Sequence, residues 1–162
     1  INGSWNVKDG VLRAIDNTDK WSCTASLSGY YKNVEISYRL RFDGENDDGF
    51  AGMSFYKQGV RDSYVVSGYC VMVTNSGQVK LYNGKTGEYL KGEGPGYIEN
   101  FDAGAKEWIS MKVTAKNGVI TIIANNKTVL TVKDSYFTEG FFSFHASESI
   151  FSIDDVSVRP VK

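Results

Sequence analysis

The sequence predicts an all-β protein built as an antiparallel β-sandwich. Apolar and polar residues alternate through several short segments, most clearly in residues 33–42, and the helical period of 3.6 residues is nearly absent. Turn pairs such as Asp9-Gly10, Asn83-Gly84 and Asn117-Gly118 separate these segments. The composition agrees, because 17 glycines, only 2 prolines and 14% aromatic residues favour strands joined by tight turns over helices.

Each expected strand is a run rich in apolar residues, bounded by turn residues or by loops. In residues 33–42, for example, the odd-numbered and even-numbered positions fall on opposite faces of a half-buried strand. The strands are expected at residues 5–13, 21–27, 33–42, 49–56, 68–74, 78–82, 89–91, 108–115, 119–124, 128–132, 141–146 and 150–159. Many short antiparallel strands with regular turns are typical of sandwiches and barrels.

Length and charge limit the possible classes of function. With 162 residues the chain is expected to form one domain, and its formal charge of -1 argues against nucleic acid as a partner. No apolar run is long enough to span a membrane, so a membrane is not expected as a partner either. The two cysteines, Cys23 and Cys70, form either one disulfide or two buried thiols, and we favour the thiols.

An ordered series of segments covers nearly the whole chain. It consists of WNVKDGVL at 5–12, GMSF at 52–55, GYCVMV at 68–73, QVKLY at 78–82, WISMKV at 108–113, DSYFTEGF at 134–141 and FSIDDV at 151–156. This series resembles the concanavalin A/laminin-G-like jelly rolls, and most closely the carbohydrate-binding modules of bacterial levanases and related glycan-degrading enzymes. The resemblance implies two stacked antiparallel sheets, with sugar bound on the concave face or at its rim.

Enzymatic activity is not expected, because the residues that common reactions need are missing. His145 is the only histidine, and no His-x-x-x-His or Cys-x-x-Cys metal spacing occurs. There is no Gly-x-Ser-x-Gly elbow, and no Glu-x-Asp-x-x-Glu strand of the laminarinase type. We therefore expect a non-catalytic module. The alternatives are a small jelly-roll glycosidase and a laminin-G-like adhesion domain.

A sugar-binding surface needs exposed aromatic rings for the C–H face of a pyranose, and planar polar groups for its hydroxyls. Strand parity predicts which side chains point outward. The resemblance implies that the strands expected at 33–42, 49–56, 68–74, 78–82 and 141–146 belong largely to the concave sheet. The side chains that point outward from this sheet then include aromatic, cationic and sulfur-containing groups. This expected ligand-binding set is Arg39, Tyr56, Met72, Lys80, Tyr82 and His145, with Trp21 and Tyr64 as platforms on the rim.

The expected ligand is a plant glycan chain, with xylan or a similar β-glycan as the first choice. The levanase modules hold a terminal fructose through acidic side chains and an arginine, whereas Ser37, Arg39 and Tyr56 stand at the matching positions here. A fructan terminus, as in levan or inulin, is the alternative. We expect residues 1–162 to be a single carbohydrate-binding module excised from a larger secreted bacterial enzyme. It is expected to be monomeric and to act outside the cell or at its surface.

Other acidic and aromatic side chains have two interpretations. The resemblance implies a structural calcium held by Asp9 and Asp154, and the acidic segment 43–48 is a second candidate, although both sets also fit ordinary turn acids. Trp5 and Trp108 are expected in the core. The Gly-rich segment 91–106, which carries Tyr97 and Phe101, is long enough to serve a function.

Overall fold

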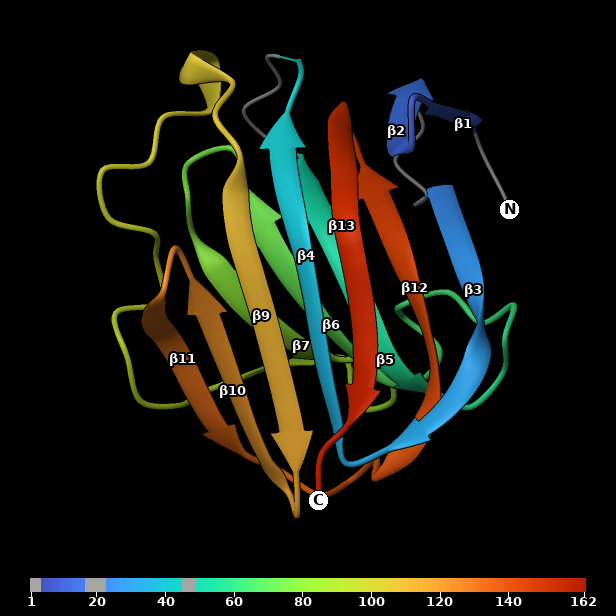
Figure 1. The fold of residues 1–162 in the computed structure, drawn as a ribbon. Coiled ribbons are helices and arrows are strands. Elements are labelled where there is room, and N and C mark those ends of the chain that lie inside the picture. Colours follow the sequence, from blue (N-terminus) through green and yellow to red (C-terminus); the bar gives the residue numbers. More distant parts are fainter. Residues whose placement is uncertain (1–3, 17–22, 45–48) are drawn as a thin grey trace.

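The computed structural model describes residues 4–16, 23–44 and 49–162, which form two antiparallel β-sheets packed face to face (Figure 1). The sandwich predicted from the alternating apolar pattern is thus confirmed. In Figure 1 one sheet lies in front and the other behind, and the C-terminus lies at the lower end.

The front sheet has seven strands among the described residues. In spatial order the strands are β1 (Ser4–Lys8), β2 (Val11–Asp16), β13 (Phe151–Pro160), β4 (Val34–Phe42), β9 (Ile109–Lys116), β10 (Val119–Ala124) and β11 (Lys127–Lys133). The first and last of them are hairpin arms, while β13 lies between β2 and β4 although it is far from both in the sequence.

The rear sheet has six strands among the described residues. Its spatial order is β3 (Cys23–Lys32), β12 (Glu139–Ser147), β5 (Phe50–Lys57), β6 (Tyr69–Thr74), β7 (Val79–Asn83) and β8 (Glu88–Leu90), so that β12 lies between β3 and β5. A short 3-10 turn, η1 (Ala103–Ala105), interrupts the long connection before β9. The late strands β12 and β13 each lie between two strands from the first part of the chain, so neither sheet is a simple succession of hairpins.

Most expected strands are found within one or two residues of the predicted bounds, with differences at the N-terminus. The segment expected as one strand at 5–13 is a hairpin, because Asp9 and Gly10 both adopt positive φ, at 53° and 81°. The strand expected at 21–27 is described from Cys23 and continues to Lys32. Trp21 lies outside the described residues.

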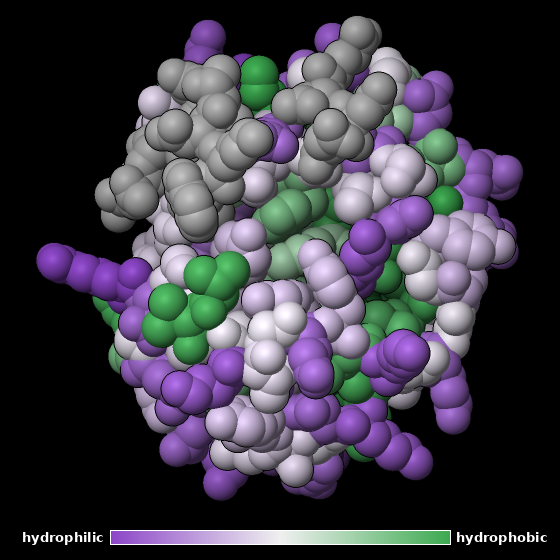
Figure 2. Space-filling model, turned by 180° about the vertical axis from the view of Figure 1, so that it is seen from behind, coloured by the Kyte–Doolittle hydropathy of each residue, from purple (hydrophilic) through white to green (hydrophobic). Residues whose placement is uncertain are grey.

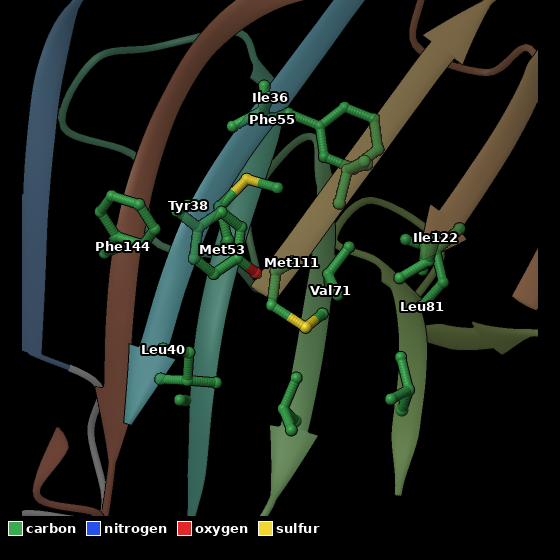
Figure 3. Close-up of a cluster of buried hydrophobic side chains, with 14 of the residues drawn as sticks. Ile36, Tyr38, Leu40, Met53, Phe55, Val71, Leu81, Met111, Ile122 and Phe144 are labelled. Atoms are coloured by element: carbon green, nitrogen blue, oxygen red, sulfur yellow. The ribbon is translucent and has the colours of Figure 1, made fainter. Parts of the chain in front are cut away.

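The core fills the space between the two sheets (Figure 3). Strand β4 contributes Ile36, Tyr38 and Leu40, and every second residue of this strand is buried. The rear sheet contributes Met53 and Phe144, and Phe144 packs against the ring of Tyr38 at a centroid distance of 5.2 Å. Burial of this many aromatic and aliphatic side chains is the dominant stabilising contribution in a sandwich.

A β-bulge near the lower end of β5 changes which residues face outward. Phe55 and Tyr56 together oppose a single residue of β12, and Tyr56 has a φ of 56°. Its ring therefore turns inward, is 4% exposed, and donates a hydrogen bond from its hydroxyl to the carbonyl of Ala115 at 3.0 Å. The expectation that Tyr56 faces outward is wrong, because the bulge reverses the parity at this position and places Lys57 on the outer face instead.

Candidate functional site

The outer face of the rear sheet carries two rows of side chains that cross the strands. One row runs from Thr24 through His145, Gly52 and Met72 to Lys80, and each neighbour in the row is a paired residue on the adjacent strand. The other row contains Ser26, Ser143, Ser54, Cys70, Tyr82 and Tyr89. We call this surface the six-stranded face.

The expected placement of Met72, Lys80, Tyr82 and His145 on one face of one sheet is confirmed by this register. Strand parity predicts it because these residues alternate with core residues such as Val71 and Leu81. Their exposure differs, however. Lys80 and Tyr82 are partly exposed, whereas Met72 and His145 are buried. Their role in binding remains a prediction.

Residues 58–67, which we call the cover loop, fold over the part of the six-stranded face that contains His145. The loop carbonyl of Val60 accepts hydrogen bonds from the hydroxyl of Ser26 at 2.8 Å and from Lys57 Nζ at 3.1 Å. Within the loop, Asp62 accepts from the hydroxyl of Ser67 at 2.5 Å. The loop is thus attached to the sheet at Val60, near its start, as well as at its two ends.

Tyr64, which the sequence suggests as a platform on the rim, belongs to the cover loop and packs against the six-stranded face. Its side chain is half-buried. Its ring makes edge contacts with Phe50, Tyr82 and His145, at centroid distances of 5.4, 5.9 and 5.6 Å. Tyr82 in turn contacts Tyr89 at 5.4 Å. These four tyrosine and phenylalanine rings, Phe50, Tyr64, Tyr82 and Tyr89, form what we call the aromatic strip.

The exposed end of the aromatic strip lies on β7 and on the edge strand β8. Tyr89 is 57% exposed, and the ammonium of Lys80 lies 5.5 Å from the centre of its ring. Figure 2, which shows this side of the molecule, has a hollow in its upper half, at the bottom of which weakly hydrophobic residues are visible. A partly open surface of this kind offers aromatic faces next to donors, the combination that a sugar ring needs.

Beneath the cover loop a polar network holds the only histidine of the chain. Ser143 Oγ lies 2.8 Å from His145 Nε2, and Thr24 Oγ1 lies 3.0 Å from His145 Nδ1. Lys57 Nζ donates to Ser143 Oγ at 3.0 Å. Because the ammonium can only donate, the Ser143 oxygen accepts from Lys57. The tautomer of the neutral imidazole decides the other two contacts: either Ser143 donates to Nε2 and Nδ1–H donates to Thr24, or Nε2–H donates to Ser143 and Thr24 donates to Nδ1.

Burial shifts the pKa values of the groups in this network. Desolvation, with a contribution from the charge of Lys57, lowers the pKa of His145 to about 3, so the imidazole is neutral near pH 7. Desolvation also lowers the pKa of Lys57 to about 8, although the Asp62 carboxylate opposes this shift. Burial raises the pKa of the Cys70 thiol to about 12, which keeps it protonated. The thiol of Cys70 is free, and the side chain of Cys23 lies outside the described residues.

The placement expected for Arg39 is wrong, because β4 belongs to the front sheet and not to the six-stranded face. Its guanidinium pairs with Asp154 at 2.7 Å and lies 5.0 Å from the centre of the Trp108 ring. Arg41 lies over the same ring at 4.7 Å. Trp108, which was expected in the core, is therefore partly exposed on the outer surface and packs against two guanidinium groups.

The side chains expected to bind calcium do not fit a calcium ion in the described part of the chain. Residues 4–16, 23–44 and 49–162 contain no group of three or more His, Cys, Asp or Glu side chains placed to bind a metal. Asp154 already faces the Arg39 guanidinium, Asp9 is exposed on a hairpin turn, and Asp43 accepts from Arg41 Nε at 2.7 Å. Calcium binding requires six to eight oxygen ligands. The remaining acids of the expected second site, Glu45, Asp47 and Asp48, lie outside the described residues.

The expected binding set did not include Lys57, Ser143 and Tyr89. Strand parity already places Ser143 outward beside His145, and Tyr89 pairs directly with Tyr82 across a hairpin whose Asn83-Gly84 turn is visible in the sequence. Lys57 could not be found, since only the bulge at Tyr56 turns it outward. Trp5 is partly buried against the core, with its ring 5.8 Å from Phe151.

The architecture and the face together define a concanavalin A-like jelly roll, and comparisons with known proteins agree. Residues 1–159 match the family described as the 3-keto-alpha-glucoside-1,2-lyase-like domain. The chain therefore belongs to this family. No curated protein matches the chain. In the described residues, no helix is both long and apolar enough to cross a membrane.

Solved structures share the fold at low sequence identity. The carbohydrate-binding module CBM66 from Bacillus subtilis has a TM-score of 0.78 and 17% identity, over 98% of this chain and 92% of that one. A Bacillus subtilis protein with a galectin-like fold has a TM-score of 0.75 and 12% identity, over 98% and 87%. A legume lectin-like domain from Entamoeba histolytica has a TM-score of 0.66 and 11% identity, over 99% and 89%. The predicted jelly-roll class is thus confirmed.

Proposed function

We propose that this domain binds a neutral glycan chain on the six-stranded face, without catalysing a reaction on it. The aromatic strip is the observation that carries the proposal. Tyr82 and Tyr89 offer rings that are not enclosed by the core, and Lys80 stands beside them as a hydrogen-bond donor. A pyranose can stack on such a ring while its hydroxyls reach the polar groups around it.

The polar groups beneath the cover loop support binding over catalysis. His145 and Lys57 are the strongest candidates for a base on this face, yet both are 0% exposed. The Tyr64 ring stands against the imidazole, and the Val60 carbonyl accepts from the ammonium. A general base must lie within hydrogen-bond reach of the proton that it removes. In this structure these groups hold the cover loop in place.

The extended shape of the strip favours an internal stretch of chain over a chain end. We propose a plant β-glycan such as xylan as the first ligand to test and a fructan terminus as the alternative. The structural similarity to a module named for carbohydrate binding supports the general class of ligand. We also propose that the domain is monomeric and serves a larger secreted polysaccharide-degrading enzyme outside the cell.

The experiment is affinity electrophoresis in gels that contain xylan, mixed-linkage β-glucan, mannan or levan. Tyr82→Ala and Tyr89→Ala are each expected to weaken binding about tenfold, which corresponds to about 1.4 kcal/mol. Tyr136→Ala is the matched control, because Tyr136 is 56% exposed and lies outside the six-stranded face. Full retention of binding by both strip variants would disprove the proposed surface, and absence of retardation in every gel would disprove glycan-chain binding.

A second candidate function follows from the name of the family, since a lyase would act on a 3-ketoglucoside. The ketone at C3 acidifies the C2 proton, a base removes it, and the electron pair forms the C1–C2 double bond as the glycosidic oxygen leaves with a proton. Lys57, whose pKa is lowered to about 8 by burial, favours this candidate because a part of its amine is neutral near pH 7.

Incubation with a methyl 3-keto-α-glucoside distinguishes the two functions. Binding alone predicts no release of methanol above the rate without protein. Release that disappears in Lys57→Met, while that variant keeps its thermal midpoint within a few degrees of the wild type, would replace the proposal with lyase activity.

A further inference from the structure

A pocket of about 320 Å³ lies at the edge of the sandwich, away from the two rows of the six-stranded face. One wall is the Gly-rich segment after β8, which contributes Tyr97, Glu99 and Asn100. The other wall is the hairpin of β10 and β11, which contributes Asn125, Lys127 and Thr128. We call it the edge pocket.

The Gly-rich wall is held by backbone hydrogen bonds to both sheets. On the side of the rear sheet, Val79 N–H donates to the carbonyl of Gly96 at 2.8 Å, and Ile98 N–H donates to the carbonyl of Gly77 at 2.9 Å. On the side of the front sheet, Gly96 N–H donates to the carbonyl of Val129 at 2.9 Å. The segment thus joins the edges of the two sheets, and Tyr97 stands on a fixed backbone.

Glycine allows this close attachment to β11. A Cβ atom at Gly94, whose φ is 124°, would lie 2.5 Å from the carbonyl oxygen of Val129. A Cβ atom at Gly92 would lie 2.1 Å from the carbonyl oxygen of Thr131. Only glycine avoids both contacts, so the glycines of this segment position the pocket wall and do not loosen it.

The pocket presents one aromatic face and several planar polar groups. Tyr97 is 50% exposed, although the next residue, Ile98, is buried in the core at 6%. The amide oxygen of Asn125 accepts from Ser110 N–H at 3.0 Å, which fixes the orientation of that carboxamide. Lys127 donates to the carboxylate of Glu99 across the pocket. The two charges compensate each other, so the pocket suits a ligand that is polar but uncharged.

We propose that the edge pocket is a second carbohydrate-binding site, which takes one neutral pyranose unit stacked on Tyr97. The amides of Asn100 and Asn125 and the Glu99–Lys127 pair bind its hydroxyls. A ring held on a rigid segment loses little conformational entropy on binding. The proposal goes beyond the six-stranded face and does not depend on it. If both sites bind, one domain holds two parts of a polysaccharide, and linked sites increase the apparent affinity.

The test is a titration of 15N-labelled protein with methyl β-xylopyranoside, methyl β-glucopyranoside and xylohexaose, followed by amide chemical shifts. Saturable shifts are expected at residues 95–100 and 124–129. Tyr97→Ala is expected to remove them, Tyr97→Phe to keep most of them because the ring remains, and Tyr136→Ala to leave them unchanged. On soluble xylan, Tyr97→Ala is expected to lower the apparent affinity at least threefold.

The two sites are distinguished by their variants. Shifts at 95–100 and 124–129 that persist in Tyr82→Ala support the edge pocket even if the six-stranded face proves inactive. Absence of shifts in these segments with all three sugars overturns the edge pocket, whether or not the face binds. Shifts that remain unchanged in Tyr97→Ala also overturn it, because the ring would then not be the platform.

Discussion

The ring of Tyr64 lies edge-on against the imidazole of His145, with a centroid distance of 5.6 Å and an interplanar angle of 69°. The two residues come from the cover loop and from β12, and their contact explains why a side chain that points away from the core is nevertheless buried. The cover loop therefore divides the six-stranded face into a closed polar part and an open aromatic part.

The first prediction concerns pH. The unfolded chain binds a proton at His145 near the ordinary pKa of about 6.5, whereas burial lowers the pKa in the folded protein to about 3. Between these values the unfolded state binds more protons, so stability falls as the pH decreases below about 6.5, with a slope of up to about 1.4 kcal/mol per pH unit from this group.

Urea unfolding at pH 5.0, 6.0 and 7.5 measures this slope. His145→Gln is the matched variant, because glutamine offers both a donor and an acceptor but does not titrate. It is expected to lose stability less steeply below pH 6.5 than the wild type. Parallel curves for the two proteins would mean that His145 becomes protonated in the folded state without penalty.

The second prediction concerns Tyr56, which lies inside the sandwich. Tyr56→Phe removes only the hydroxyl that donates to the Ala115 carbonyl, and it is expected to cost about 1 kcal/mol. Tyr56→Ala is expected to cost about 3–5 kcal/mol, because it leaves a cavity between the sheets. Thermal melting measures both. Glycan affinity is expected to be unchanged in Tyr56→Phe, and a large loss of affinity without loss of stability would contradict the inward position of the ring.

The third prediction concerns Leu40, a core residue of β4 that is 1% exposed. Leu40→Ala is expected to reduce the free energy of unfolding by about 2–5 kcal/mol through lost burial and a residual cavity. Glu107→Ala serves as the control, because Glu107 is exposed. A loss below about 1 kcal/mol in chemical denaturation would show that the core tolerates the deletion by collapse.

The sequence predicts the burial of β4 well because alternation is a local signal. Val34, Ile36, Tyr38, Leu40 and Phe42 face the core as their spacing predicts. The same parity correctly places Lys80 and Tyr82 on the outer face of β7. Parity does not tell which of the two sheets a strand joins, because that depends on long-range pairing, and Arg39 was assigned to the wrong sheet for this reason.

Two further features of the site could not be read from the sequence. The bulge at Tyr56 depends on the pairing of β5 with β12, two strands that are distant in the chain. The position of the cover loop depends on contacts between Val60 and residues of β3 and β5. Loops attached by a few side-chain hydrogen bonds carry no periodic signal in sequence, so the sequence shows only that Tyr64 lies between the strands expected at 49–56 and 68–74.

The fourth prediction concerns Arg39. Because it lies on the front sheet with Asp154 and Trp108, Arg39→Ala is expected to leave glycan affinity unchanged. A modest loss of stability of about 1 kcal/mol is expected, since a partly exposed ion pair and a cation–π contact are both weak. Affinity electrophoresis and a melting curve of the same variant measure the two effects. A fall in affinity without a fall in melting temperature would place a ligand on the front sheet.

The last prediction concerns salt. A neutral glycan has no charge for ions to screen, so its affinity for the six-stranded face is expected to change less than twofold between about 20 and 500 mM NaCl. Lys80 then acts as a hydrogen-bond donor next to Tyr89, and Lys80→Gln, which keeps a donor, is expected to retain most of the affinity. An anionic glycan would instead lose affinity steeply as salt increases, and Lys80→Gln would abolish that dependence. Calorimetric titrations of the wild type and Lys80→Gln with xylan and with a polyuronate, at both salt concentrations, distinguish the two kinds of ligand. Only a ligand that binds through the ammonium charge of Lys80 loses affinity both when the salt concentration increases and when Lys80 is replaced.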